Sequence, residues 1–409
     1  MRFILPAMLL FASIFSPMGQ AAAEEAPSLS PGEIHGESAI LIDGTTGTIL
    51  FEKNADVPLY PASITKIATG IYAIEKGNPE DIVTVSRNAR YVEGTRVYLG
   101  EGEQVSLKKL EYGLLMHSGN DAAIAIAEHL AGSVEQFAEE LNHFLAERVE
   151  LSNTHFTNPH GLHDPDHYTT AADMAKIAQY AMKNPVFREI VATNRLPWDG
   201  REWKSELINH NKMLRNYEGA TGIKNGFTDQ ARHTLVASAK RGNTEFIAVT
   251  MKAQSSNYAY QDVTKLLDYG FAHFETRQIA QQGDQFSVEG NTGDTPQYYT
   301  DANLFVTAPL GAELKQEVTL GGNLLVQAGD KSFFFQLKQK EVPKPPAAVA
   351  AQSANPPLEE DTPSVARYVL FFAWMLFNAL LVFYVAVRVR RRKRERQQMT
   401  QSYYRRSVS

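Results

Sequence analysis

The 409-residue chain is 44% hydrophobic and 21% charged, which excludes wholesale disorder, and it lacks cysteine, which excludes disulfides and thiol chemistry. Its formal net charge is -6, yet residues 24–387 carry 30 basic and 45 acidic side chains, because nine Lys or Arg gather in residues 388–409. Such an acidic body repels phosphate backbones, so we expect no nucleic-acid partner.

Residues 1–23 predict a secretory signal peptide. Arg2 gives a basic start, residues 3–15 are apolar apart from Ser13, and three alanines end at Ala23. The apolar run is too short to span a bilayer. We therefore expect cleavage after Ala23 and export of the remaining chain.

Residues 39–44 and 47–51 predict two strands, and a Ser and a Lys spaced three apart follow them. Pro61 favours the start of a helix, so Ser63 and Lys66 would lie one turn apart on the same face. Burial lowers the pKa of a lysine, and a neutral Lys66 amine beside Ser63 would accept the hydroxyl proton. Taken alone, this pattern is more typical of a solvated helix face.

A polar turn separates two predicted helices, 107–117 and 122–130. Ser118 in this turn is a candidate proton relay between Lys66 and a leaving group. The Asn120 amide is a candidate donor to a substrate carbonyl. A simple capped connection between two helices is the alternative interpretation.

A third motif precedes the predicted strand 234–239. Gly226 would let a strand edge approach a substrate backbone closely. Lys224 would offer positive charge to an anionic group, and the backbone amides of Phe227 and Ser63 would form an oxyanion hole. The alternative is an ordinary strand edge that contains a glycine.

The C-terminal third predicts a different organisation. In residues 276–341, short runs of alternating apolar and polar residues are separated by glycine-containing turns, which predicts a small β-rich domain of hairpins. Residues 342–367 form a Pro/Ala-rich linker. Residues 368–387 carry no charge and are long enough for a transmembrane helix, and the basic tail 388–409 predicts a cytoplasmic C-terminus. We expect a single-pass cell-membrane protein whose body is extracytoplasmic, on the periplasmic or cell-wall side.

The three motifs occur in the order of the S-x-x-K, S-D-N and K-T-G signature of penicillin-binding proteins and class A β-lactamases. The neighbouring stretches 156–161 (FTNPHG), 169–174 (TTAADM) and 266–271 (LLDYGF) add to this likeness. Over about residues 30–275 the chain resembles the serine-type D-Ala-D-Ala carboxypeptidases, the low-molecular-weight penicillin-binding proteins of bacterial cell-wall maturation.

This resemblance implies an α+β fold, a β-lactamase/transpeptidase-like antiparallel sheet flanked by helices within residues 24–275. It implies that Ser63 is the acylated nucleophile and that Lys66 is its general base. Ser118 would relay the proton, Asn120 would hold the substrate, and Lys224 would be the cation of the third motif. The implied substrates are peptidoglycan stem peptides ending in D-Ala-D-Ala. Penicillins and other β-lactams would be covalent inhibitors, and no metal or cofactor is needed.

Two departures from the family concern the substrate carboxylate. Asn225 stands where relatives usually have Thr or Ser, and residues 255–261 lack the Arg that many relatives carry there. Arg232, where relatives usually have Gly, is a candidate replacement cation, with a solvated strand residue as the alternative. We therefore expect Asn225, Gly226, Phe227 and Arg232 to line the substrate site.

Three other functions remain open. A β-lactamase would share the nucleophile but needs a carboxylate-activated water, and residues 160–166 match the carboxypeptidase loop instead. A D,D-endopeptidase would use the same chemistry on cross-links. A catalytically weakened wall-binding or scaffolding protein would follow if the altered third motif had lost turnover.

Overall fold

The structure is a computed structural model that describes residues 29–288, 297–329, 331–340 and 375. The chain divides into two units, residues 1–341 and 342–409. The predicted signal peptide, linker and basic tail lie outside the described residues, as does the predicted membrane helix except for Met375. Among the described residues, no helix is both long and apolar enough to cross a membrane.

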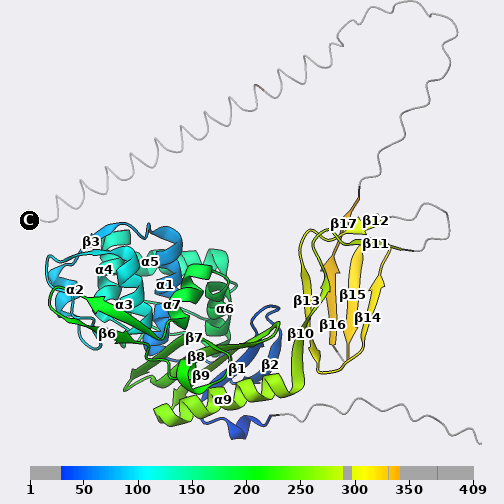
Figure 1. Ribbon diagram of the computed structural model, residues 1–409, viewed down its shortest axis with the longest axis horizontal. Coiled ribbons are helices and arrows are strands. Elements are labelled where there is room, and N and C mark those ends of the chain that lie inside the picture. Colours follow the sequence, from blue (N-terminus) through cyan, green and yellow to red (C-terminus); the bar gives the residue numbers. More distant parts are fainter. Residues whose placement is uncertain (1–28, 289–296, 330, 341–374, 376–409) are drawn as a thin grey trace, which may run out of the picture. The chain divides into compact units, whose positions relative to one another are not determined.

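A five-stranded antiparallel sheet forms the centre of the first unit, in the order β2-β1-β9-β8-β7 (Figure 1). Its strands are β1 (Ser38–Asp43), β2 (Ile49–Lys53), β7 (Ala220–Thr228), β8 (Arg232–Arg241) and β9 (Thr244–Ala253). β1 pairs with both β2 and β9, so strands from distant parts of the chain lie side by side. Strand β7, which carries the third motif, is an edge of this sheet.

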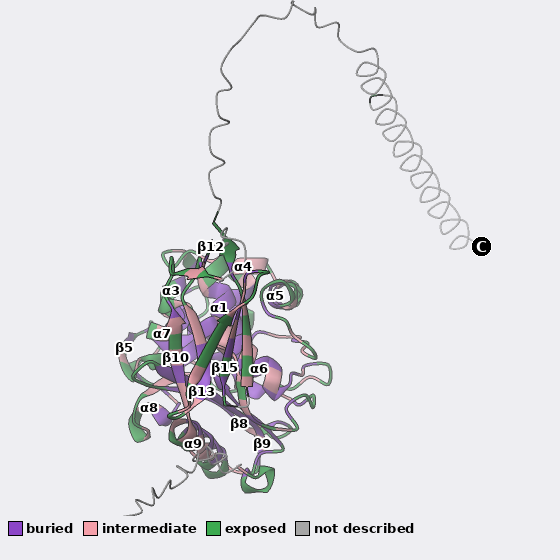
Figure 2. Cartoon of the chain, turned by 90° about the vertical axis from the view of Figure 1, so that its right-hand side faces the viewer, coloured by how far each residue is buried: buried purple, intermediate pink, exposed green. Residues whose placement is uncertain are grey.

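Both faces of the sheet are buried, because side chains alternate between two cores. Ile40 and Val249 pack against helices on one face, whereas Leu41 and Phe246 pack against α9 (Ser256–His273) on the other. Figure 2 shows buried residues concentrated in the sheet and in α1. The helices of the first face are α1 (Lys66–Lys76), α3 (Leu107–Met116), α4 (Asn120–Ala131), α5 (Val134–Arg148), α6 (Ala171–Met182) and α7 (Pro185–Ala192).

Local signals in the sequence explain the helices next to the second motif. Ser106 caps α3 by accepting a hydrogen bond from Lys109 N, as its position before the apolar pattern predicts. Helix α4 ends at Gly132, whose φ of 82° is readily adopted by glycine. These two residues therefore set the outer ends of the pair of helices that flank the second motif. Shorter elements complete this part: α2 (Arg87–Tyr91), α8 (Met213–Asn216), β3 (Ile82–Thr84), β4 (Gln104–Ser106), β5 (Arg195–Asp199) and β6 (Lys204–Ile208).

The predicted β-rich segment consists of antiparallel strands in its described residues. They are β10 (Phe274–Ala280), β11 (Gln285–Ser287), β12 (Gln297–Tyr299), β13 (Leu304–Pro309), β14 (Leu314–Val318), β15 (Asn323–Ala328), β16 (Lys331–Gln336) and β17 (Lys338–Gln339). They enclose a small core of their own that includes Val306 and Val326. Asp43 of the central sheet accepts hydrogen bonds from Thr276 (2.6 Å) and Thr307 (2.9 Å), which ties the two parts together.

Candidate active site

Ser63 lies in a 3-10 turn, Ala62–Thr65, that leads directly into α1. A helical turn containing Ser63 does start after Pro61, as its position favours, but it is a 3-10 turn and α1 itself begins only at Lys66. Ala62 has a φ of 52°, a left-handed conformation that an α-helix does not contain, so the α-helix starts only after this turn. The tight turn still places Lys66 Nζ 3.1 Å from Ser63 Oγ.

Lys66 is fully buried, and its Nζ contacts three oxygen atoms. Besides Ser63 Oγ, it lies 2.7 Å from Asn120 Oδ1 and 2.7 Å from the His160 carbonyl oxygen. Burial, reinforced by the nearby Lys224 charge, holds the pKa of Lys66 well below its usual range, although Asp121 opposes the shift. A neutral amine has two N–H groups and one lone pair. The two N–H groups match Asn120 and His160, which leaves the lone pair for the Ser63 hydroxyl.

Asn120 is the first residue of α4, and its backbone contacts fix its amide. Its Nδ2 donates to the Glu93 carbonyl (2.6 Å), and its backbone N donates to the Thr95 carbonyl (2.7 Å). Because a carbonyl can only accept, Nδ2 faces Glu93 and Oδ1 faces Lys66. Ser118 precedes α4 in a left-handed conformation, with a φ of 66°.

The third motif brings a second buried cation to the site. Lys224 on β7 is buried, and its Nζ donates to the Asn225 carbonyl at 2.9 Å. Burial lowers the pKa of Lys224 to about 7. The Asn225 side chain is half-buried, and its Oδ1 has no hydrogen-bond partner among the residues that the structure describes.

Gly226 brings β7 against the nucleophile turn. A Cβ at this position would lie 2.7 Å from Ser63 N and 3.2 Å from Ala62 Cβ. The β7 backbone therefore approaches Ser63 at a distance that only glycine allows without a shift. Phe227 follows, half-exposed, with its ring 4.6 Å from that of His233.

Arg232 lies at the start of β8, paired across the hairpin with Thr228. Its side chain is exposed, and its φ of 54° is in the region that favours glycine. The structure thus places Arg232 on the same hairpin as Lys224 but does not join it to the buried site.

The comparisons with known proteins agree with this geometry. Residues 21–255 match the family described as D-alanyl-D-alanine carboxypeptidase. The chain belongs to this family. It is 36% identical over 303 residues to D-alanyl-D-alanine carboxypeptidase DacD of Escherichia coli (strain K12), covering 70% of this chain and 76% of that protein. The motif-based resemblance is therefore confirmed, and with it the class of serine peptidase hydrolase.

Two further matches extend the comparison. D-alanyl-D-alanine carboxypeptidase DacF of Bacillus subtilis (strain 168) is 37% identical over 252 residues, which cover 59% of this chain and 64% of DacF. The crystal structure of penicillin binding protein 5 from Haemophilus influenzae superposes with a TM-score of 0.68 at 28% identity, covering 76% of this chain and 98% of that one. The predicted antiparallel sheet with flanking helices is confirmed as the penicillin-binding fold.

Several groups around the carboxypeptidase site were missed by the sequence reasoning. The His160 carbonyl accepts from Lys66, and burial lowers the pKa of the His160 imidazole to about 3. Asp121 accepts from the backbone N atoms of Val97 (3.0 Å) and Leu99 (3.1 Å), which holds that segment beside α4. The stretch 156–161 signals the family, but a backbone carbonyl has no side-chain signature that would reveal its role.

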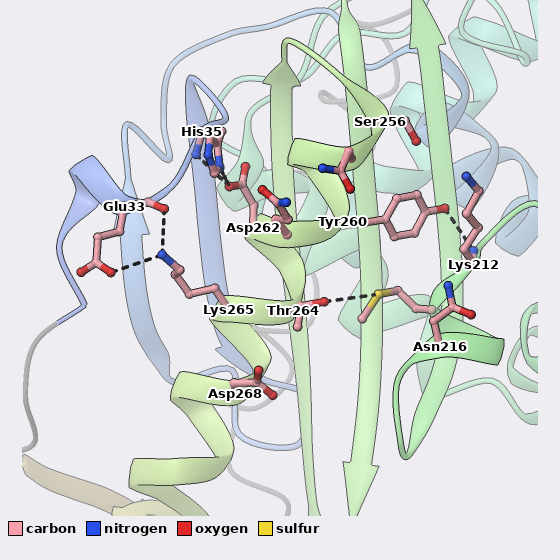
Figure 3. Close-up of a pocket in the computed structure, with 13 residues that line it drawn as sticks. Glu33, His35, Lys212, Asn216, Ser256, Tyr260, Asp262, Thr264, Lys265 and Asp268 are labelled. Atoms are coloured by element: carbon pink, nitrogen blue, oxygen red, sulfur yellow. Dashed lines mark hydrogen bonds and ion pairs between the residues drawn. The ribbon is translucent and has the colours of Figure 1, made fainter.

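A cavity of about 870 Å³ lies away from the motif residues, between the first described residues, α8 and α9 (Figure 3). His35 and Lys212 are among its lining residues, and Tyr260 OH receives a hydrogen bond from Lys212 N at 3.1 Å. None of the residues of the three motifs lines it. The cavity is therefore distinct from the carboxypeptidase site.

Proposed function

We propose that this protein is a serine D,D-carboxypeptidase that removes the terminal D-Ala from peptidoglycan stem peptides through an acyl-enzyme on Ser63. The observation that carries the proposal is the environment of Lys66. Two acceptors engage its N–H groups, and Ser63 Oγ lies 3.1 Å away as the one partner that has a proton to give. Family membership and the relatives' names support this activity and give no support to the alternatives.

Acylation begins when the neutral Lys66 amine takes the Ser63 proton and Oγ attacks the carbonyl carbon of the penultimate D-Ala. The N–H groups of Ser63 and Phe227 stabilise the resulting oxyanion. The C–N bond then breaks, and the proton passes through Ser118 to the amine of the departing D-Ala. Water attacks the ester in the second half-reaction, which releases the shortened peptide and restores Ser63.

Substrate orientation depends on the second and third motifs. The Asn120 amide lies beside Lys66, where it can contact the amide of the stem peptide next to the scissile bond. Lys224, Asn225 and Arg232 supply the groups for the terminal carboxylate. The loss of the hydroxyl at Asn225 weakens this subsite relative to the family, and the exposed guanidinium of Arg232, on the same hairpin as Lys224, is the candidate to replace it.

The predicted location completes the proposal. The signal peptide (1–23) exports the chain, the apolar segment 368–387 anchors it in the cell membrane, and the basic tail 388–409 stays in the cytoplasm. The linker 342–367 lets the catalytic part act on the wall from an extracytoplasmic position. Protease protection of the tail in sealed membrane vesicles tests this topology.

Labelling with a fluorescent penicillin tests the acyl-enzyme directly. The full chain should form a covalent adduct, and a Lys66→Arg variant should acylate at least a hundredfold more slowly, because arginine does not give up its charge. A folded wild-type chain that forms no adduct would contradict the proposal and favour a wall-binding protein. Rapid penicillin hydrolysis would instead indicate a β-lactamase.

A further inference from the structure

A directed chain of hydrogen bonds runs behind the nucleophile turn. Thr157 N donates to His167 Nδ1 at 3.0 Å, so this nitrogen must be the acceptor. His167 Nε2 then carries the proton and donates to Thr65 Oγ1 at 2.8 Å. The Thr65 hydroxyl donates in turn to the Ala62 carbonyl oxygen at 2.9 Å. Each link has one direction, because an amide N–H only donates and a carbonyl only accepts.

The end of this chain belongs to the peptide unit that contains the Ser63 N–H. The Ala62 C=O and the Ser63 N–H lie in one plane and point in opposite directions, so fixing one group fixes the other. Ala62 holds a left-handed φ of 52°, which is strained for a residue with a Cβ. The surrounding contacts must therefore hold this plane in place.

Both ends of the peptide plane are tightly enclosed. A Cβ at Gly161 would lie 1.9 Å from the Ala62 carbonyl oxygen, and a Cβ at Gly226 would lie 2.7 Å from Ser63 N. Thr65 is fully buried, and His167 is 1% exposed, with its ring 5.2 Å from that of Phe156. Burial lowers the pKa of His167 to about 3, so the ring stays neutral, and the Thr157 N–H sets which of its nitrogens carries the proton.

We propose that His167 is a positioning residue of the oxyanion hole: through Thr65 it fixes the Ala62 carbonyl and thereby aims the Ser63 N–H at the substrate oxygen. His167 lies behind the turn and does not touch the reacting atoms. The inference rests on the proposed function, in which the Ser63 N–H stabilises the oxyanion. It assigns a role to a loop residue that belongs to none of the three motifs.

The test compares two substitutions in the full chain. His167→Phe keeps a ring of similar size but removes the hydrogen bonds of both ring nitrogens, whereas His167→Gln keeps an amide donor for Thr65. We expect His167→Phe to lower kcat for D-Ala release about ten- to a hundredfold, less than the loss of a whole oxyanion donor. KM should change less than twofold, and His167→Gln should recover much of the rate. His155→Phe is the matched control, because His155 lies in the same loop but bonds the Asp166 carbonyl.

The affinity of a peptide boronic acid separates a positioning role of His167 in the oxyanion hole from a purely structural role, which would leave this affinity unchanged in the folded enzyme. Its tetrahedral adduct on Ser63 places an oxygen in the oxyanion hole, so its affinity should fall in His167→Phe in parallel with kcat/KM. Labelling stoichiometry with penicillin gives the folded, active fraction. Thr65→Val removes the next hydroxyl in the same chain of hydrogen bonds. Its effect on kcat and on boronate affinity should therefore not add to the effect of His167→Phe in the double variant.

Three results would overturn the inference: a folded His167→Phe with wild-type kcat, a lower kcat with unchanged boronate affinity, or no recovery in His167→Gln. If His167→Phe does not fold, Thr65→Val decides by the same criteria. Failure of the proposed function gives a different pattern, since the wild-type chain would then release no D-Ala and form no penicillin adduct.

Discussion

Gly226→Ala is a sharp test of how closely the sheet edge must approach the nucleophile. The added Cβ would lie 2.7 Å from Ser63 N and 2.6 Å from Thr234 Oγ1. An ordinary contact is at least 3.4 Å, so β7 and the turn must separate by about 0.7 Å at Ser63. That separation moves the two proposed oxyanion donors apart. A displacement of about 1 Å at a reacting centre costs about a hundredfold in rate.

We therefore expect Gly226→Ala to lower kcat/KM about a hundredfold, or about 2.7 kcal/mol, which is at the low end of losing one oxyanion donor. The assay follows D-Ala release from a short peptide ending in D-Ala-D-Ala, together with the rate of penicillin acylation. Gly321→Ala is the control, because the nearest atom to its Cβ lies 3.6 Å away. A folded Gly226→Ala enzyme with wild-type acylation would refute the reasoning about the β7 edge.

Three further predictions concern the carboxylate, the anchor and a buried lysine. Arg232→Ala should lower kcat/KM about ten- to a hundredfold for peptides with a free C-terminal carboxylate but leave kcat/KM for a neutral ester substrate unchanged. Equal effects on both substrates would show that Arg232 is a solvated surface residue without a role in binding. Truncation after Glu341 should give a soluble protein with wild-type D-Ala release, and a folded but inactive product would show that the anchor assists catalysis. Burial lowers the pKa of Lys224 from 10.5 in the unfolded chain to about 7 in the folded one. Between pH 7 and 10.5 the unfolded chain therefore binds more protons than the folded chain, and the free energy of unfolding should rise with pH across that range. Urea titrations should show a smaller rise in Lys224→Met, and an identical slope would count against the burial effect.

The sequence predicts the elements whose signals are local. Short apolar runs such as residues 39–44 and 234–239 indicate strands of the central sheet, and Ser106 and Gly132 mark helix ends that the structure confirms. The motif spacing predicts Ser63 and Lys66 one turn apart, and the structure places their side chains within hydrogen-bond distance. These features depend on side-chain type and short spacing, which a single sequence displays.

The remaining features depend on backbone groups that meet across the fold. The left-handed Ala62 and the 3-10 turn before α1 arise from packing against Gly161 and β7, which the local pattern Pro61 to Lys66 does not encode. The His160 carbonyl and the His167–Thr65 bond join a loop about 100 residues away to the nucleophile. Isolated histidines in a loop give no signal of such partners until the loop is placed.

Mass analysis of the products formed from muropeptides tests the central claim most directly. The full-length chain should convert pentapeptide stems to tetrapeptide stems with release of one D-Ala, and Ser63→Ala should abolish this conversion while leaving the protein folded. Cleavage of cross-linked dimers without any shortening of pentapeptides would indicate an endopeptidase. Unchanged D-Ala release in Ser63→Ala would contradict the acyl-enzyme account.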